Sequence, residues 1–187
     1  MTPDDPAGRY LARRYLGFAV CNPALRYRRD VPHPSGSRWP AMLCRIDNAA
    51  GEMVAVQRVF LTLDGHKAKL DPVKAAKGPV WTAAIRFGTG PEIVIAEGPE
   101  TAIAAGIVLG LPAWSAISAG NLARGLTLPV DVQGVVIAAD NDAPGIDAAE
   151  RAARRWQTEG RQVRVVKPDE PGSDFANLLA RRAGAPA

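Results

Sequence analysis

The chain has 187 residues, of which 47% are hydrophobic and 22% charged, and a formal net charge of +4. This composition is typical of a globular protein long enough to bury a core, and no apolar run reaches the roughly 20 residues that a membrane-spanning helix needs. The first residues, MTPDDPAGRYLARRYLG, lack the apolar core of a signal peptide. We therefore expect a cytoplasmic protein that has no membrane partner.

The charges are unevenly divided along the chain. Residues 1–90 contain 14 Lys and Arg against 7 Asp and Glu, whereas residues 91–187 contain 9 against 12. A basic half joined to an acidic half suggests a polyanion held by one part and a cation-dependent site in the other. The two cysteines and two histidines are too few and too scattered for a zinc site, so two ordinary thiols are expected.

The basic half begins with a segment that predicts a small β-rich α+β domain. Residues 9–17 are expected to form a helix. After a Pro-rich stretch, residues 41–65 have the pattern of a β-meander, with turns at Asn48–Gly51 and at Asp64-Gly65.

The remainder of the basic half carries its lysines. Residues 66–78 are expected to form a lysine-bearing loop, and residues 80–88 a further strand. A domain boundary is predicted near Gly88–Pro91, which divides the chain into domains of residues 1–90 and 91–187.

Strands and helices alternate regularly in the second half. Because each strand is a continuous apolar run, the fold class predicted is α/β, with a parallel sheet covered by helices on both faces. The expected strands are residues 92–96, 113–118, 134–140 and 161–168, and the expected helices are residues 99–110, 119–126, 145–160 and 174–184.

Three acids lie where two of these strands end. Glu97 follows the first strand, and Asp140 and Asp142 follow the third, so the topology brings all three to one edge of the sheet. Carboxylates that converge repel one another unless a cation lies between them, and oxygen ligands favour Mg²⁺ or Mn²⁺. This predicts metal-assisted phosphoryl transfer or phosphodiester cleavage. An Asx turn at Asp140 and Asp142, with Glu97 as a helix-capping residue, is the alternative interpretation of the same residues.

The segments IVIAEGPETAIAAG and GVVIAADNDAPG resemble the Toprim domain, which bacterial-type DNA primases, type IA and II topoisomerases and some nucleases share. The family has a Glu-Gly after its first strand and an Asp-x-Asp after its third, matched here by Glu97-Gly98 and by Asp140 and Asp142. The resemblance covers about residues 91–183. It implies that the three acids are catalytic and bind the divalent metal, with Glu97 as a general acid or base.

The preceding segment resembles the corresponding part of primase-like Toprim proteins of phages, plasmids and mobile elements. In that family basic residues line the path of template and nucleotides. Asp174 is a candidate secondary acid of this chain, although helix capping is the role that its position favours. No zinc ribbon or G-x-x-x-x-G-K-[ST] loop is found, so a zinc-ribbon or helicase partner is expected. The basic residues implicated by position are Lys67, Lys69, Lys74, Lys77, Arg58 and Arg86.

These observations favour Mg²⁺-dependent nucleotidyl transfer, in which nucleoside triphosphates are joined into an RNA primer on single-stranded DNA. Two alternatives remain open at this point. A Toprim nuclease would use the same three acids to cleave phosphodiesters, and a non-catalytic accessory module would bind nucleic acid alongside partner proteins.

Overall fold

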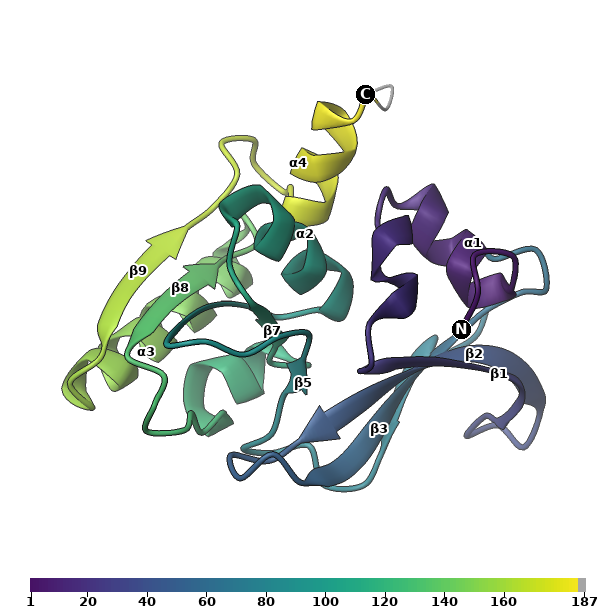
Figure 1. Cartoon of the computed structure of the whole chain (residues 1–187), viewed down its shortest axis with the longest axis horizontal. Coiled ribbons are helices and arrows are strands. Elements are labelled where there is room, and N and C mark those ends of the chain that lie inside the picture. Colours follow the sequence, from purple (N-terminus) through teal and green to yellow (C-terminus); the bar gives the residue numbers. More distant parts are fainter. Residues whose placement is uncertain (185–187) are drawn as a thin grey trace. The chain divides into compact units, whose positions relative to one another are not determined.

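A computed structural model of the chain describes residues 1–184 and divides into two compact units (Figure 1). Unit 1 consists of Met1–Ile46 and Met53–Pro79, and unit 2 of Asp47–Glu52 together with the chain from Val80 onward. Each unit is built on its own sheet, with four strands in unit 1 and five in unit 2. Of the helices in residues 1–184, none combines the length and the apolar character needed to cross a membrane.

Unit 1 is the β-rich part that the sequence predicts, with strand order β1-β2-β3-β4. The turn predicted at Asn48–Gly51 joins β2 to β3: Gly51 has a φ of 83°, and the Asn48 side chain accepts a hydrogen bond from the Glu52 amide at 3.0 Å. The elements in chain order are α1 (Pro6–Arg13), the 3₁₀ helix η1 (Gly17–Cys21), β1 (Leu25–Pro32), β2 (Arg38–Asp47), β3 (Met53–Phe60) and β4 (Lys74–Lys77).

Three expectations for unit 1 are corrected. The first helix starts at Pro6 rather than residue 9, because Asp5 caps it by accepting a hydrogen bond from the Gly8 amide at 2.8 Å. The strand β1 was not expected at all. The lysine-bearing segment is only partly a loop, since its residues 74–77 form β4, an edge strand antiparallel to β3.

Unit 2 confirms the predicted α/β class. Its sheet has the order β5-β7-β6-β8-β9, in which β7, β6, β8 and β9 are parallel. The helix α2 ends where predicted, at Gly110 with a φ of 68°. The elements are β5 (Ile85–Arg86), β6 (Glu92–Ala96), α2 (Pro99–Leu109), β7 (Ala113–Ser115), the π-helical turn η2 (Asn121–Gly125), β8 (Gly134–Ala138), α3 (Ala143–Thr158), β9 (Gln162–Val166) and α4 (Phe175–Arg182).

The strand expected at residues 80–88 shrinks to the two residues of β5, and it pairs antiparallel with β7 at the edge of the parallel sheet. Thr82 has a φ of 70°, a conformation that no regular strand contains, so the extended segment can begin only after it. Trp81, just before it, is 54% exposed and therefore cannot be an inward-facing strand residue.

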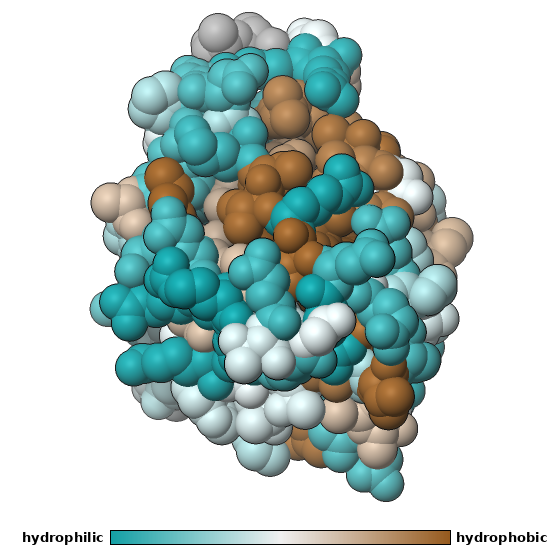
Figure 2. All heavy atoms as spheres, turned by 90° about the vertical axis from the view of Figure 1, so that its left-hand side faces the viewer, coloured by the Kyte–Doolittle hydropathy of each residue, from teal (hydrophilic) through white to brown (hydrophobic). Residues whose placement is uncertain are grey.

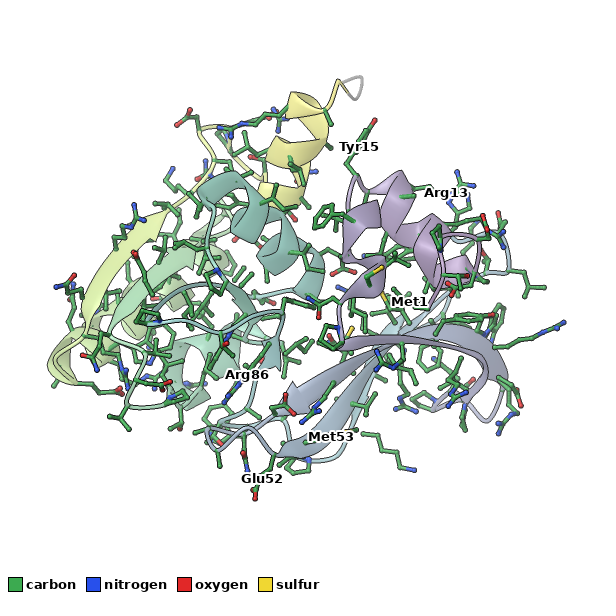
Figure 3. The ribbon with its side chains drawn as sticks, in the orientation of Figure 1. Met1, Arg13, Tyr15, Glu52, Met53 and Arg86 are labelled. Atoms are coloured by element: carbon green, nitrogen blue, oxygen red, sulfur yellow. The ribbon has the colours of Figure 1, made fainter. Side chains whose placement is uncertain are left out.

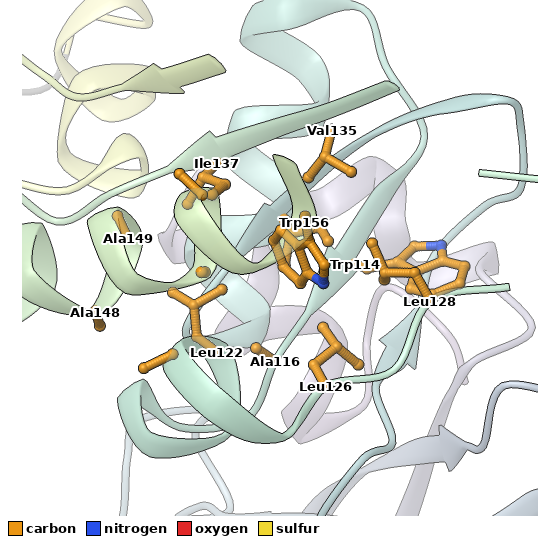
Figure 4. Packing of buried hydrophobic residues seen from close by; sticks show 14 of the residues in the cluster. Trp114, Ala116, Leu122, Leu126, Leu128, Val135, Ile137, Ala148, Ala149 and Trp156 are labelled. Carbon is orange, nitrogen blue, oxygen red and sulfur yellow. The ribbon is translucent and has the colours of Figure 1, made fainter. Parts of the chain in front are cut away.

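Helices cover both faces of this sheet, as Figure 1 shows for α2 and α3. On one face, side chains of β6 and β8 pack with those of α3 and η2 around Trp114 and Trp156, which are 1% and 0% exposed (Figure 4). The alternate residues Val94 and Val136 face the other side, where α2 contacts β6, β7 and β8. The core therefore holds β6 and β8 rigidly side by side.

The outer edge of the sheet is β9, whose residue Val165 is 42% exposed. Figure 2 shows hydrophobic side chains gathered among hydrophilic ones on the side of the molecule that faces left in Figure 1, where β9 lies. The other edge strand of the sheet is β5, which is antiparallel to its neighbour β7.

Candidate functional site

Glu97 lies at the carboxyl end of β6, in the link to α2. It is half-buried, and its carbonyl oxygen accepts a hydrogen bond of 2.7 Å from the Ser115 hydroxyl at the end of β7. The next residue, Gly98, is the N-cap of α2, and a β-carbon there would make only ordinary van der Waals contacts, 3.8 Å from Oε2 of Glu100 and 3.9 Å from Oγ1 of Thr101. The backbone at Glu97 is thus held by β6, which it follows, and by Ser115 at the end of β7.

Asp140 and Asp142 lie at the same edge, because β8 is parallel to β6 and in register with it. Asp140 is half-buried, with its Oδ1 atom shielded from solvent, whereas Asp142 is exposed. Asp142 is the N-cap of α3, and its Oδ1 atom accepts a hydrogen bond from the Gly145 amide at 2.7 Å. Asp142 therefore caps a helix, and this hydrogen bond occupies one of its two carboxylate oxygens. Glu97 does not cap α2, whose N-cap is Gly98 without a side-chain hydrogen bond.

Asn141, between the two acids, is a site residue that sequence reasoning missed. It is 9% exposed, and its Nδ2 atom donates to the carbonyls of Pro168 and Asp169 at 3.0 and 3.3 Å. Its Oδ1 atom accepts a hydrogen bond of 3.0 Å from the Lys167 ammonium. Its main chain also pairs with Ser173 and Gly172. These bonds hold the acid-bearing loop against the segment that follows β9.

Gly145 fits closely beneath the acids. A β-carbon at this position would lie 2.7 Å from the Asp140 carbonyl oxygen and 2.9 Å from Oδ1 of Asp142. Only glycine allows the first turn of α3 to pack this tightly. The glycine in the sequence therefore determines where Asp140 and Asp142 lie.

The three acids share an edge of the sheet, but within residues 1–184 no three His, Cys, Asp or Glu side chains are grouped closely enough to hold a metal ion. The type of ligand atom nevertheless suits a hard cation such as Mg²⁺, because all three side chains supply oxygen. The topology thus brings the three backbones together as predicted, without a closed cluster of side chains.

Two further acids, Asp174 and Glu100, stabilise the starts of helices. Asp174 caps α4 in a capping box with Asn177, and its Oδ2 atom accepts a hydrogen bond of 3.1 Å from the Thr101 hydroxyl of α2. Both of its carboxylate oxygens are therefore engaged, which confirms the capping role. Glu100 lies buried in the first turn of α2, where the helix dipole stabilises a carboxylate.

The four predicted lysines do not form one surface. Lys67 and Lys69 are exposed in the connection between β3 and β4. Lys74 and Lys77 are three residues apart on β4 and therefore point to opposite faces of the sheet. Of the two, Lys77 is the more exposed and lies opposite Val56 of β3.

The two predicted arginines hold the fold together. Arg58 donates hydrogen bonds to the carbonyls of Ala75, Ala76 and Pro32, so it fastens the edge strand β4. Arg86 stacks over the Trp114 ring at 4.1 Å and donates to the Asn48 carbonyl. Burial lowers the pKa of its guanidinium. Figure 3 shows Arg86 near the turn that carries Glu52, within unit 2.

Unit 1 carries a basic surface that the lysines alone did not predict. Arg26 and Arg28 alternate along β1, and Arg26 lies opposite Leu43 of β2, so both point to the face that also carries Arg45. A groove of about 290 Å³ lies on this face. Arg26, Arg28, Arg45 and Lys77, all exposed, are called the basic sheet face below.

The lining of this groove is partly apolar, since Leu43, Val56 and Met53 line it together with Arg26 and Arg45. Met53, at the start of β3, is 56% exposed (Figure 3). The sequence feature that could have predicted the basic sheet face is the alternation of arginines in LRYRR, which places two of them on one face of a strand.

Comparison with known proteins gives two family matches. Residues 2–87 match a domain family of unknown function, DUF7146, and residues 92–185 match the Toprim domain family. No protein with a curated description matches the chain significantly.

Solved primase structures share the fold. The RNA polymerase domain of Mycobacterium tuberculosis primase DnaG is 16% identical, with a TM-score of 0.61, and the match covers 96% of this chain and 72% of that one. A DnaG primase catalytic domain bound to single-stranded DNA is 16% identical, with a TM-score of 0.58 and coverages of 96% and 68%.

A DNA primase domain from Pseudomonas aeruginosa is 19% identical, with a TM-score of 0.53, over 90% of this chain. The match spans only 55% of that domain's length. At these identities the likeness concerns the fold. Since the Toprim match covers half of the sequence, the chain belongs to the Toprim family, and its fold is like that of the catalytic cores of bacterial primases.

Proposed function

We propose that the protein is a primase-like nucleotidyltransferase, which joins nucleoside triphosphates into short RNA on single-stranded DNA with the help of Mg²⁺ or Mn²⁺. The observation that carries the proposal is the position of Glu97, Asp140 and Asp142 at the carboxyl ends of the adjacent parallel strands β6 and β8. Ligands bind at this edge in open α/β sheets.

Glu97, Asp140 and the outer oxygen of the Asp142 cap would hold the cation, which supplies positive charge to the triphosphate and to the attacking oxygen. The residues around them keep the acids in place. Asn141 fastens the loop, and Gly145 lets the helix pack under it. Glu97, at the carboxyl end of β6, is the residue proposed to take up or release the proton of the attacking hydroxyl.

The basic sheet face is proposed to bind the nucleic acid strand. Its cations attract phosphates, and the apolar lining residues Leu43, Val56 and Met53 offer contact to unpaired bases. The related DnaG domain bound to single-stranded DNA supports this choice of partner. Lys67, Lys69 and Lys74 are proposed to contribute to the path of nucleotides, whereas Arg58 and Arg86 are proposed to position the strands that carry the basic residues.

In this proposal residues 1–90 form the template-binding domain and residues 91–187 the Toprim domain. The protein would act in the cytoplasm within a mobile element's replication machinery, and a zinc-ribbon or helicase protein is its proposed partner.

The decisive experiment measures the incorporation of labelled nucleoside triphosphates on single-stranded DNA. Glu97→Gln and Asp140→Asn should each reduce the rate by about 100-fold or more, because removal of a metal ligand takes away several kcal/mol of transition-state stabilisation. Chelation with EDTA should do the same. Glu150→Gln, which alters an exposed acid of α3 paired with Arg154, is the matched control and should leave the rate unchanged.

A second candidate is a non-catalytic accessory module, which is favoured by the lack of a closed group of three metal ligands within residues 1–184. It predicts binding of single-stranded DNA with no incorporation in any variant. The nuclease alternative predicts metal-dependent cutting of DNA without nucleoside triphosphates, which the same gels would reveal. Each outcome therefore selects one of the three functions.

The basic sheet face is tested separately by the affinity for a fluorescent single strand. Arg26→Ala combined with Arg45→Ala should weaken binding and reduce the slope of log K against log salt by about 0.7 for each phosphate that the variant no longer neutralises. Arg154→Ala, an exposed arginine of α3, is the control. Unchanged affinity and slope in the double variant would remove this face from the proposal.

A further inference from the structure

Unit 1 contains a second basic feature, a cavity of about 190 Å³ between the end of α1 and the turn that follows β3. The permanent cations Arg13, Arg14 and Lys67 line it, together with His66. Arg13 extends from the last turn of α1 (Figure 3). The full lining is Tyr10, Arg13, Arg14, Gly65, His66 and Lys67.

The walls of this cavity are fastened to each other. Gly65 is pressed against α1, since a β-carbon there would lie 2.7 Å from that of Arg9, and its φ is 86°. Arg9 donates a hydrogen bond of 2.9 Å to the Leu63 carbonyl, and Arg13 one of 3.4 Å to the Asp64 carbonyl. The turn therefore cannot move away from the helix without breaking these hydrogen bonds, and the cavity is preformed.

Its side chains are also held in place. The Arg14 guanidinium lies over the Tyr10 ring at 5.4 Å, and Tyr10 itself is only 3% exposed. His66 closes the turn through its main chain, since its amide donates to the Thr62 hydroxyl at 3.1 Å. Holding the cations before a ligand arrives reduces the entropic cost of binding.

The charge in the cavity favours an anion. Three permanent positive charges come from the lining residues Arg13, Arg14 and Lys67. One negative charge comes from Asp64, which does not line the cavity but precedes Gly65, and a hydrogen bond from Thr62 lowers the pKa of its carboxyl group. The C-terminal end of a helix such as α1 adds only about half a negative charge. The net charge of Arg13, Arg14, Lys67 and Asp64 taken together is therefore positive.

We propose that this cavity binds a phosphoanhydride group, either free pyrophosphate or the triphosphate of a nucleotide. A water molecule takes about 30 Å³ of liquid volume, so the cavity has room for linked phosphates and some of their water. Arginine and lysine together suit this ligand, because guanidinium groups bind phosphate oxygens in pairs and ammonium groups act as point charges. The proposal rests on the proposed function only for where the anion comes from. Binding of the anion itself depends only on residues of unit 1.

The test is calorimetric titration of the full chain with inorganic pyrophosphate, and in a second arm with ATP, in EDTA. Because no metal is present, the result does not depend on Glu97, Asp140 or Asp142, and failure of primer synthesis would not affect it. Arg14→Ala and Lys67→Ala should each weaken binding about ten-fold, the value of one charge-assisted hydrogen bond, and the double variant should abolish it.

Arg154→Ala, an exposed arginine of unit 2, is the matched control and should bind like the unaltered chain. Arg14→Lys keeps the charge and should retain part of the affinity, which separates loss of charge from loss of folding. If the chain binds pyrophosphate but not ATP, the ligand is the free anion. If it binds both pyrophosphate and ATP, the ligand is the triphosphate of a nucleotide. No binding of either, or equal affinity in the double variant, would overturn the proposal.

Discussion

Replacing Gly145 by alanine tests whether close packing under the acids sets their position. The added β-carbon would lie 2.7 Å from the Asp140 carbonyl oxygen, 2.9 Å from Oδ1 of Asp142 and 3.1 Å from the Asp140 β-carbon. Ordinary contacts between such atoms lie at about 3.5 Å. The helix must therefore move away from the acid-bearing loop, or the loop from the helix.

The expected cost has three parts. Overpacking of a closely fitted site costs about 1–3 kcal/mol. Loss of the cap between Asp142 and the Gly145 amide, which is 2.7 Å long, costs about 1 kcal/mol more. Alanine regains about 1 kcal/mol through its better helix propensity. The free energy of unfolding should fall by about 1–3 kcal/mol, and metal-dependent activity should fall further than stability, because Asp140 and Asp142 are displaced.

Urea unfolding followed by tryptophan fluorescence measures the stability change. Gly120→Ala is the matched control, because Gly120 has helical φ and ψ angles of −63° and −42° and a β-carbon there would meet nothing within 4 Å. That variant should be neutral or more stable by about 0.4–1 kcal/mol. Equal stability of Gly145→Ala and the unaltered chain, within about 0.5 kcal/mol, would refute the packing argument.

Three further substitutions follow from buried contacts. Asn141→Ala should lower the free energy of unfolding by about 1–3 kcal/mol, because it leaves the buried carbonyl of Pro168 without a donor and removes the acceptor of the Lys167 ammonium. Faster proteolysis near residues 167–173 would show this loss. Thr101→Val should cost about 1 kcal/mol by removing the hydrogen bond to Asp174, measured by thermal unfolding; no change would mean that the bond is dispensable. Trp156→Ala should cost about 3–5 kcal/mol, because the side chain is 0% exposed, and a smaller loss in urea would contradict its central place in the core.

The arrangement of the Toprim half could be predicted because local signals and topology agree there. Apolar runs ended by Glu97-Gly98 and by Asp140 define the strand ends, and parallel strands put their carboxyl ends at one edge. The close fit of Gly145 and the hydrogen bonds of Asn141 could not be predicted, because both depend on residues brought together only in the folded chain.

The basic half was harder to predict because its cations serve two purposes. Arg58 and Arg86 carry the same charge as the exposed lysines, but their donors are used by main-chain carbonyls of their own unit. The spacing of the lysines does not predict one basic surface. Lys74 and Lys77 lie on a strand rather than in a loop, and a strand places residues three apart on opposite faces. Only the pairing of β1 with β2 shows that Arg26 and Arg45 share a face.

The most direct measurement of the proposed metal site is the anomalous difference density of a crystal soaked in Mn²⁺. The proposal predicts a single strong peak at the edge of the sheet, in contact with carboxylate oxygens of Glu97, Asp140 and Asp142, and loss of that peak in crystals of Asp140→Asn. A soaked crystal with no peak at these three residues, or with one that persists unchanged in Asp140→Asn, would contradict it.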